Sequence, residues 1–215
     1  MNKKLIWTIV ALVGGYIFLQ ALADVAATKL VAVGGFAIPA GTFVFTITFT
    51  LRDMIHKRLG REWARAAIFI AGGFNLIMAG YLYWMAQLPS PVFIPEIVGE
   101  NWAGVFALVP SIVVASITAE VVSTLIDTEV YHRIMERFRG KMQFMRVIIS
   151  NAISLPVDSL IFGFLAFMIL PPLLGGGTHT VPEVLDIAYG QIIWKAIVTV
   201  VSLPGIYLVK EELIV

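Results

Sequence analysis

Six apolar stretches, each close to 20 residues long, recur along this chain of 215 residues. A helix needs ~20 predominantly apolar residues to cross the ~30 Å hydrocarbon core of a bilayer. Soluble proteins contain fewer apolar residues than this chain, in which 59% are hydrophobic and 13% are charged. We therefore expect an all-α integral membrane protein that forms a single transmembrane domain over residues 1–215. The six predicted helices cover about residues 5–23, 36–55, 64–88, 102–126, 144–170 and 185–209.

The basic residues are distributed unevenly over this predicted topology. Of the 15 lysines and arginines, all but Lys29 and Lys195 lie near the chain ends or around the second and fourth loops. The opposite loops carry acidic residues, namely Glu96, Glu100, Glu183 and Asp186. Because cytoplasmic loops carry the excess of Lys and Arg, both termini are predicted to be cytoplasmic. A basic patch for anionic lipid or nucleic acid is the alternative, and the net charge of +1 argues against a nucleic-acid partner.

The N-terminal sequence allows one alternative to a first spanning helix. Two lysines, an apolar run and the small residues Ala21 and Ala23 are also typical of a cleavable signal peptide. The run from Leu5 to Ala23 is 19 residues long, which is enough to span the bilayer, so we expect a retained helix.

Polar residues line one face of each of the last three predicted helices, at spacings of three and four. An ionisable group at membrane depth costs ~2.5–3.5 kcal/mol, so such groups mark functional sites or neutralise one another. A purely structural pair of Lys195 with Asp158 or Glu120 is the alternative to a ligand site. The sequence also repeats a polar pattern from Glu120 to Asp127 in the segment from Asn151 to Asp158. The predicted substrate-binding residues are Glu120, Asp127, Asn151, Asp158, Gln191 and Lys195.

Other kinds of site are disfavoured by the residues present. The chain has no cysteine, and its three histidines are not at metal-ligand spacing, so we expect no metal site. We also expect no cofactor and no enzyme activity, because no histidine accompanies the intramembrane serines as a triad would require. Asp24 and Lys29, which follow the first predicted helix, are each expected to lie at the membrane interface.

Short motifs in a fixed order resemble those of the queuosine precursor transporter family, which is also described as vitamin-uptake-transporter-like. The motifs are Ala27–Val31 with Gly34-Gly35, Ala40-Gly41 with Phe45, Thr48-Phe49 with Asp53, Leu125–Asp127, and Ser150 and Ser154 with Asp158-Ser159 and Phe162. The resemblance implies import of 7-cyano-7-deazaguanine or its aminomethyl analogue across the bacterial inner membrane, as secondary transport that a protonatable carboxylate could couple to protons. The expected partners are thus a nucleobase-like small molecule and the lipid bilayer, with the oligomeric state left open.

Two rival functions remain. The chain could be the substrate-binding subunit of an energy-coupling-factor importer, for which Ala23 and Ala27 would offer a small-residue docking face. It could also be a structural protein in which the buried charges only pair with one another.

Overall fold

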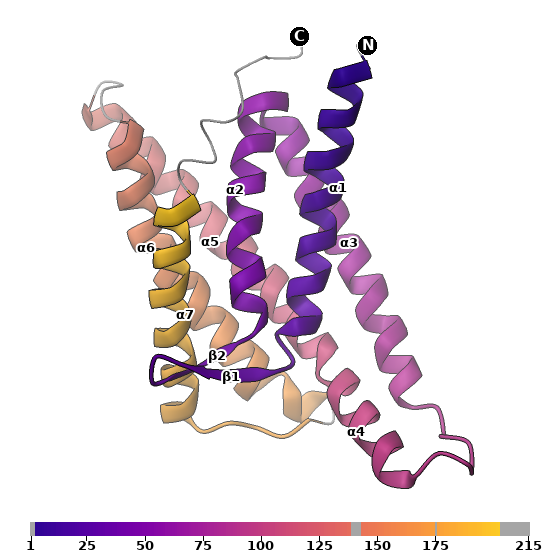
Figure 1. The fold of residues 1–215 in the computed structure, drawn as a ribbon. Helices are drawn as coiled ribbons and strands as arrows, with labels where there is room; N and C mark the ends of the chain where they lie inside the picture. Colours follow the sequence, from indigo (N-terminus) through magenta and orange to yellow (C-terminus); the bar gives the residue numbers. More distant parts are fainter. Residues whose placement is uncertain (1–2, 139–142, 175, 203–215) are drawn as a thin grey trace.

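The structure, a computed structural model, describes residues 3–138, 143–174 and 176–202 (Figure 1). Helices dominate this part of the chain, and they run roughly side by side as a bundle (Figure 1). The α-helices are α1 (Lys3–Ala26), α2 (Gly41–Leu59), α3 (Arg61–Ala86), α4 (Glu96–Ala107), α5 (Val109–Phe138), α6 (Gln143–Phe164) and α7 (Val181–Ser202). A π-helical turn at Leu165–Ile169 continues α6, and a 3-10 turn follows at Pro171–Leu173.

The predicted all-α membrane class is confirmed. Five helical segments of the described chain are long and apolar enough to cross a bilayer: Leu5–Ala26, Glu62–Ala86, Glu96–Thr124, Ala152–Leu173 and Val181–Val201. The helix α2 is 19 residues long and does not meet this criterion, because its second half carries several charged side chains, including Arg52 and Lys57. The chain is therefore a multi-pass membrane protein.

Residues 36–40, predicted as the start of the second helix, do not form a helix. Leu30–Val33 (β1) and Phe36–Pro39 (β2) form an antiparallel hairpin, in which Leu30 pairs with Pro39. Gly34 and Gly35 both have positive φ, at 60° and 87°, which matches a two-residue hairpin turn of the kind that glycine favours. The apolar residues of β2 raise hydropathy as a helix would, so an apolar run alone did not distinguish the two structures.

A helix break divides the predicted fourth span. Leu108 separates α4 from α5, and Pro110 follows in the first turn of α5. Proline has no N–H to donate to the preceding turn, so a continuous helix would be interrupted there.

The bundle carries apolar side chains on its outside and polar side chains within. Large apolar residues such as Trp7, Phe69 and Ile77 are at least 70% exposed, as expected for helix faces in contact with lipid. Apolar clusters fill the two ends of the interior, one between α1, α2 and α3 and another between α5, α6 and α7. The buried polar and charged side chains of the middle include Asp24, Asn75, Ser116, Glu120, Asp158, Gln191 and Lys195.

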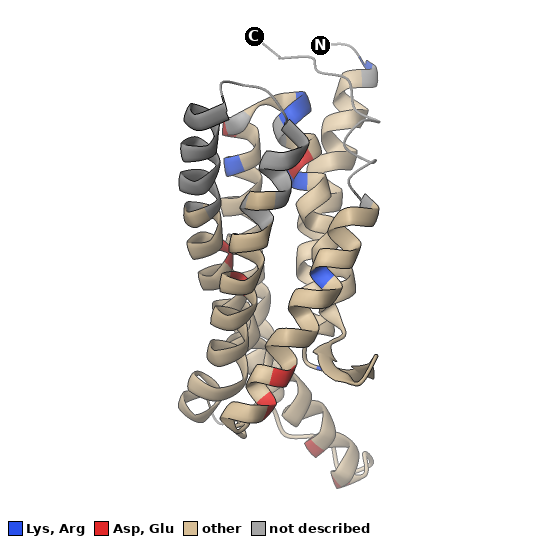
Figure 2. Cartoon of the chain, turned by 90° about the vertical axis from the view of Figure 1, so that its left-hand side faces the viewer, with Lys and Arg blue, Asp and Glu red and all other residues tan. Residues whose placement is uncertain are grey.

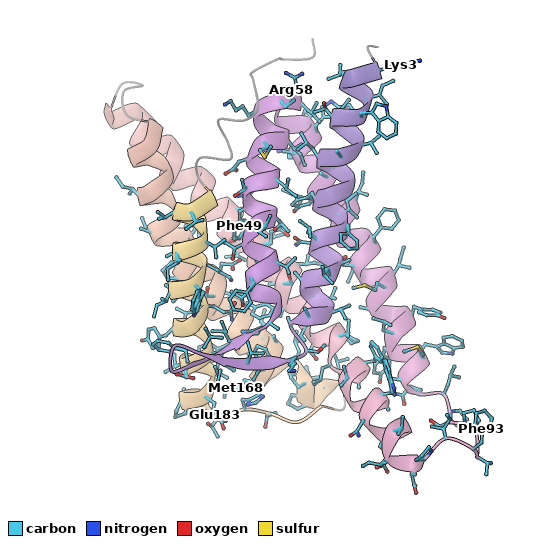
Figure 3. All side chains as sticks on the ribbon, viewed as in Figure 1. Lys3, Phe49, Arg58, Phe93, Met168 and Glu183 are labelled. Atoms are coloured by element: carbon cyan, nitrogen blue, oxygen red, sulfur yellow. The ribbon has the colours of Figure 1, made fainter. Side chains whose placement is uncertain are left out.

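Charge is segregated along the bundle axis. Figure 2 shows the described lysines and arginines mainly towards the end where α1 begins, with acidic residues both at the opposite end and among the basic residues. Figure 3 shows Lys3 and Phe93 at these two opposite ends. The segregation agrees with the loop pattern in the sequence.

Candidate functional site

The centre of the site is an ion pair between two helices. Lys195 of α7 lies with its Nζ 2.7 Å from Asp158 Oδ2 of α6, and the two side chains are 2% and 3% exposed. Lys195 Nζ also donates to Ser159 Oγ at 3.3 Å, and Ser123 Oγ of α5 donates to Asp158 Oδ1 at 3.2 Å. The Phe45 ring of α2 lies 5.3 Å from the ammonium, within cation–π range. Four helices thus converge on one pair of opposite charges.

Asp24 supplies a second buried carboxyl, and the prediction that it lies at the interface is wrong. It is 3% exposed within α1, which extends to Ala26. Its Oδ2 accepts a hydrogen bond of 2.6 Å from Asn75 Nδ2 of α3. A sequence signal for this burial exists, because Gln20 and Asp24 are four residues apart and share a helix face.

A cavity lies between these groups; the space not filled by atoms there, including the part open to the outside, is about 340 Å³. Its polar and aromatic walls include Asp24, Phe45, Ser116, Asp158, Gln191 and Lys195. Phe162, Pro39 and Gly41 also line it. Five helices and the end of the hairpin therefore line a cavity whose walls combine polar and charged side chains with apolar ones.

Gln191 leaves a hydrogen-bonding group free in this cavity. The residue is 2% exposed, and its Nε2 has no hydrogen-bond partner among the described residues. An unpaired buried donor costs ~1–3 kcal/mol. Buried side-chain atoms of Gln20, Asn75 and Ser111 also lack a partner among the described residues, but these residues do not line the cavity, whereas Gln191 does.

Glu120, a predicted substrate-binding residue, is held by hydrogen bonds from α1. It is 7% exposed and lies outside the lining of the cavity. Its Oε1 accepts from Tyr16 Oη at 2.9 Å, and its Oε2 accepts from Gln20 Nε2 at 3.0 Å. Glu120 therefore joins α5 to α1.

The structure brings three of the predicted residues to the cavity, namely Asp158, Gln191 and Lys195. The side chains of Asp127 and Asn151 lie outside the described residues. Sequence reasoning missed Asp24 and Ser116 as lining residues, and it gave Phe45 no specific role. Ser116 is four residues before Glu120 on α5, so its spacing did place it on the polar face.

A second cavity, with about 270 Å³ of empty space, lies on the other side of Asp158. Phe49 and Arg52 of α2 line it, with Ser154 of α6 and Ser123 of α5. The guanidinium of Arg52 lies 5.3 Å from the centre of the Phe49 ring. Phe45 and Phe49 of α2 therefore each have a cation close to the ring. Asp158 lines both cavities, so its pair with Lys195 lies where the two spaces meet.

The small-residue face proposed for docking is covered by other residues of the chain. Ala23 and Ala27 are 2% and 5% exposed, because the helix start at Gly41 approaches their backbone so closely that no side chain would fit there. This small-residue face is used inside the chain.

No group of three or more potential metal-binding side chains occurs in the part of the chain that was searched.

Comparison with known proteins places the chain in a transporter family. Residues 39–209 match the family described as "Putative vitamin uptake transporter". A relative from Bacillus subtilis (strain 168), named "Probable queuosine precursor transporter", is 23% identical over 195 residues, 90% of this chain and 81% of that protein. No solved structure matches the chain. Since the family match runs from the end of the hairpin beyond α7 and covers well over half of the sequence, the chain belongs to the putative vitamin uptake transporter family.

Proposed function

We propose that this protein imports a queuosine precursor, 7-cyano-7-deazaguanine or its aminomethyl analogue, across the bacterial inner membrane by secondary transport. The observation that carries the proposal is a cavity between five helices, with buried polar and charged side chains in its lining, in a family of transporters. The name of the Bacillus subtilis relative supports the substrate class. Transport, rather than an enzymatic reaction, follows from the family.

The cavity offers the groups that a guanine-like base requires. The free Nε2 of Gln191 can donate to the ring carbonyl, and a carboxylate can accept from the N–H and the exocyclic amine beside it. Phe45 and Phe162 line the same space and can cover the face of the ring. We assign substrate contacts to Asp158, Gln191 and Lys195, and we add Asp24. Glu120, Asp127 and Asn151 stay predictions.

The two cavities supply a route along the bundle. The first is lined by Pro39 of the hairpin, and the second by Arg52 of the half of α2 that carries the basic residues. The Lys195–Asp158 pair, which lies between them, must give way for a substrate to pass. A base that offers donors to Asp158 competes with Lys195 for the same oxygens, so binding itself weakens the barrier.

The orientation follows from the distribution of charge. The basic residues mark the cytoplasmic side, so the first cavity, near the hairpin, is the one closer to the outside. Both termini are then cytoplasmic.

Uptake of a labelled 7-deazaguanine by cells that cannot synthesise it tests the proposal. Cells expressing the protein should accumulate the base, and Asp158→Asn should abolish accumulation at an equal level of protein in the membrane. Absence of uptake by the wild-type protein would contradict the proposed function. The same assay in cells without energy-coupling-factor ATPases separates secondary transport from the role of a substrate-binding subunit, because only the latter needs them.

A further inference from the structure

The charges that line the first cavity do not balance. Its ionisable side chains are two carboxyls, Asp24 and Asp158, and one amine, Lys195. Lys195 forms an ion pair with Asp158, with its Nζ 2.7 Å from Asp158 Oδ2. The carboxyl of Asp24 is therefore the one ionisable group of this lining that has no charged partner.

The neighbours of Asp24 do not supply the missing positive charge. Its Oδ2 accepts from the neutral amide of Asn75, and the neutral hydroxyl of Ser116 lies on the same wall. No cation of the described chain forms an ion pair with Asp24. Burial without a counter-ion favours the neutral form of a carboxyl, and a cation from outside the chain would favour its ionised form.

Building on the proposed function, we propose that the preferred substrate is a planar base with a protonated amine, which pairs with Asp24 as the amide of Gln191 binds the ring. A primary alkyl amine is protonated at neutral pH, as the lysine side chain is, whereas a nitrile is neutral. Of the two queuosine precursors, the aminomethyl compound is therefore the better ligand. The 7-cyano compound would leave Asp24 without a counter-ion.

Gln191 gives independent support for a ligand at this position. Its Nε2 has no partner among the described residues, although the side chain is 2% exposed and lines the cavity that contains Asp24. A ligand with an acceptor and a cationic group would pair with Gln191 Nε2 through the first and with the Asp24 carboxyl through the second. A simple cation would satisfy only the carboxylate.

Competition between the two bases tests this inference. In cells that make neither base, we expect the wild-type protein to import the aminomethyl compound with a KM roughly tenfold or more below that of the cyano compound. Asp24→Asn should remove this preference, because it should raise the KM for the aminomethyl compound about tenfold and change the KM for the cyano compound less. The asparagine keeps an oxygen that can accept from Asn75, so the fold has no reason to change. Glu62→Gln, a carboxyl change at an 81% exposed side chain, should leave the preference intact.

Binding of each base to the purified wild-type protein gives a second measurement that needs no variant. Tighter binding of the aminomethyl compound supports the inference. Equal binding, or a preference that survives Asp24→Asn, overturns it and leaves the proposed function standing; the second result is expected if Asp24 simply carries a proton. If the wild-type protein neither binds nor imports either base, the proposed function fails, and the inference fails with it.

Discussion

Lys195 and Asp158 are 37 positions apart in the sequence, yet their charged groups lie 2.7 Å from each other in the middle of the bundle. The pair holds α7 against α6, and it also lies between the two cavities. A single bond thus serves the stability of the bundle and closes the proposed route.

Removal of one partner should expose the structural part of this role. We expect Lys195→Met to lower the free energy of unfolding by about 3–5 kcal/mol, because it leaves Asp158 buried without its cation. The double variant, with Asp158→Asn added, should regain most of that stability. Neither the single nor the double variant should take up substrate. Denaturant unfolding in detergent, together with the uptake assay, measures both effects. A single variant as stable as the wild type would show that the pair does not hold the helices.

Two buried glutamines should respond to substitution in opposite directions. Gln20 Nε2 donates to Glu120, whereas Gln191 Nε2 has no partner among the described residues. Gln20→Met should therefore lower stability by about 1.5–3 kcal/mol, while Gln191→Met should raise it by about 1 kcal/mol. Uptake should show the reverse order, with the larger loss for Gln191→Met. The unfolding temperature and the KM for uptake are compared between the two variants. Equal losses of stability would contradict the absence of a hydrogen-bond partner for Gln191 Nε2.

The hairpin should tolerate no side chain at its closest approach to α7. A Cβ at Gly190 would collide with Ile38 and Phe36 of β2, whereas one at Gly80 on α3 would meet no atom within 4 Å. We expect Gly190→Ala to cost about 1–3 kcal/mol and to reduce uptake, because β2 ends at Pro39 in the cavity wall. Gly80→Ala should be neutral or slightly stabilising, since alanine favours helix. A normal unfolding temperature for Gly190→Ala would show that the hairpin adapts freely.

The absence of cysteine from the sequence makes the orientation directly testable. Single cysteines at Lys3 and at Phe93, an 83% exposed side chain between α3 and α4, would report the two ends of the bundle. An impermeant thiol reagent applied to intact cells should label Phe93→Cys alone, and Lys3→Cys should react only after permeabilisation. Labelling in the opposite sense would place the basic end outside.

The class of the fold could be predicted from the sequence because spanning a bilayer requires one simple property, a long apolar run. Each of the six predicted runs contains a helix found in the structure, although two of them deviate locally. Phe36–Pro39 pairs as a strand, and α4 and α5 meet at Leu108 instead of forming one helix. Both deviations come from turn-forming glycines or a proline, whose effects a hydropathy pattern does not record.

The candidate site depended far more on the tertiary structure. The spacing along each helix did single out Asp158, Gln191 and Lys195, because helical periodicity decides which residues share a face. It could not decide which carboxyl Lys195 would neutralise, since that depends on how α6 and α7 pack. Glu120 and Asp24 show the consequence: the first is bound by Tyr16 and Gln20, and the second lines the cavity without a cation. The sequence by itself determined that charges would be buried, whereas the packing of the helices decided which charged groups lie in contact with one another.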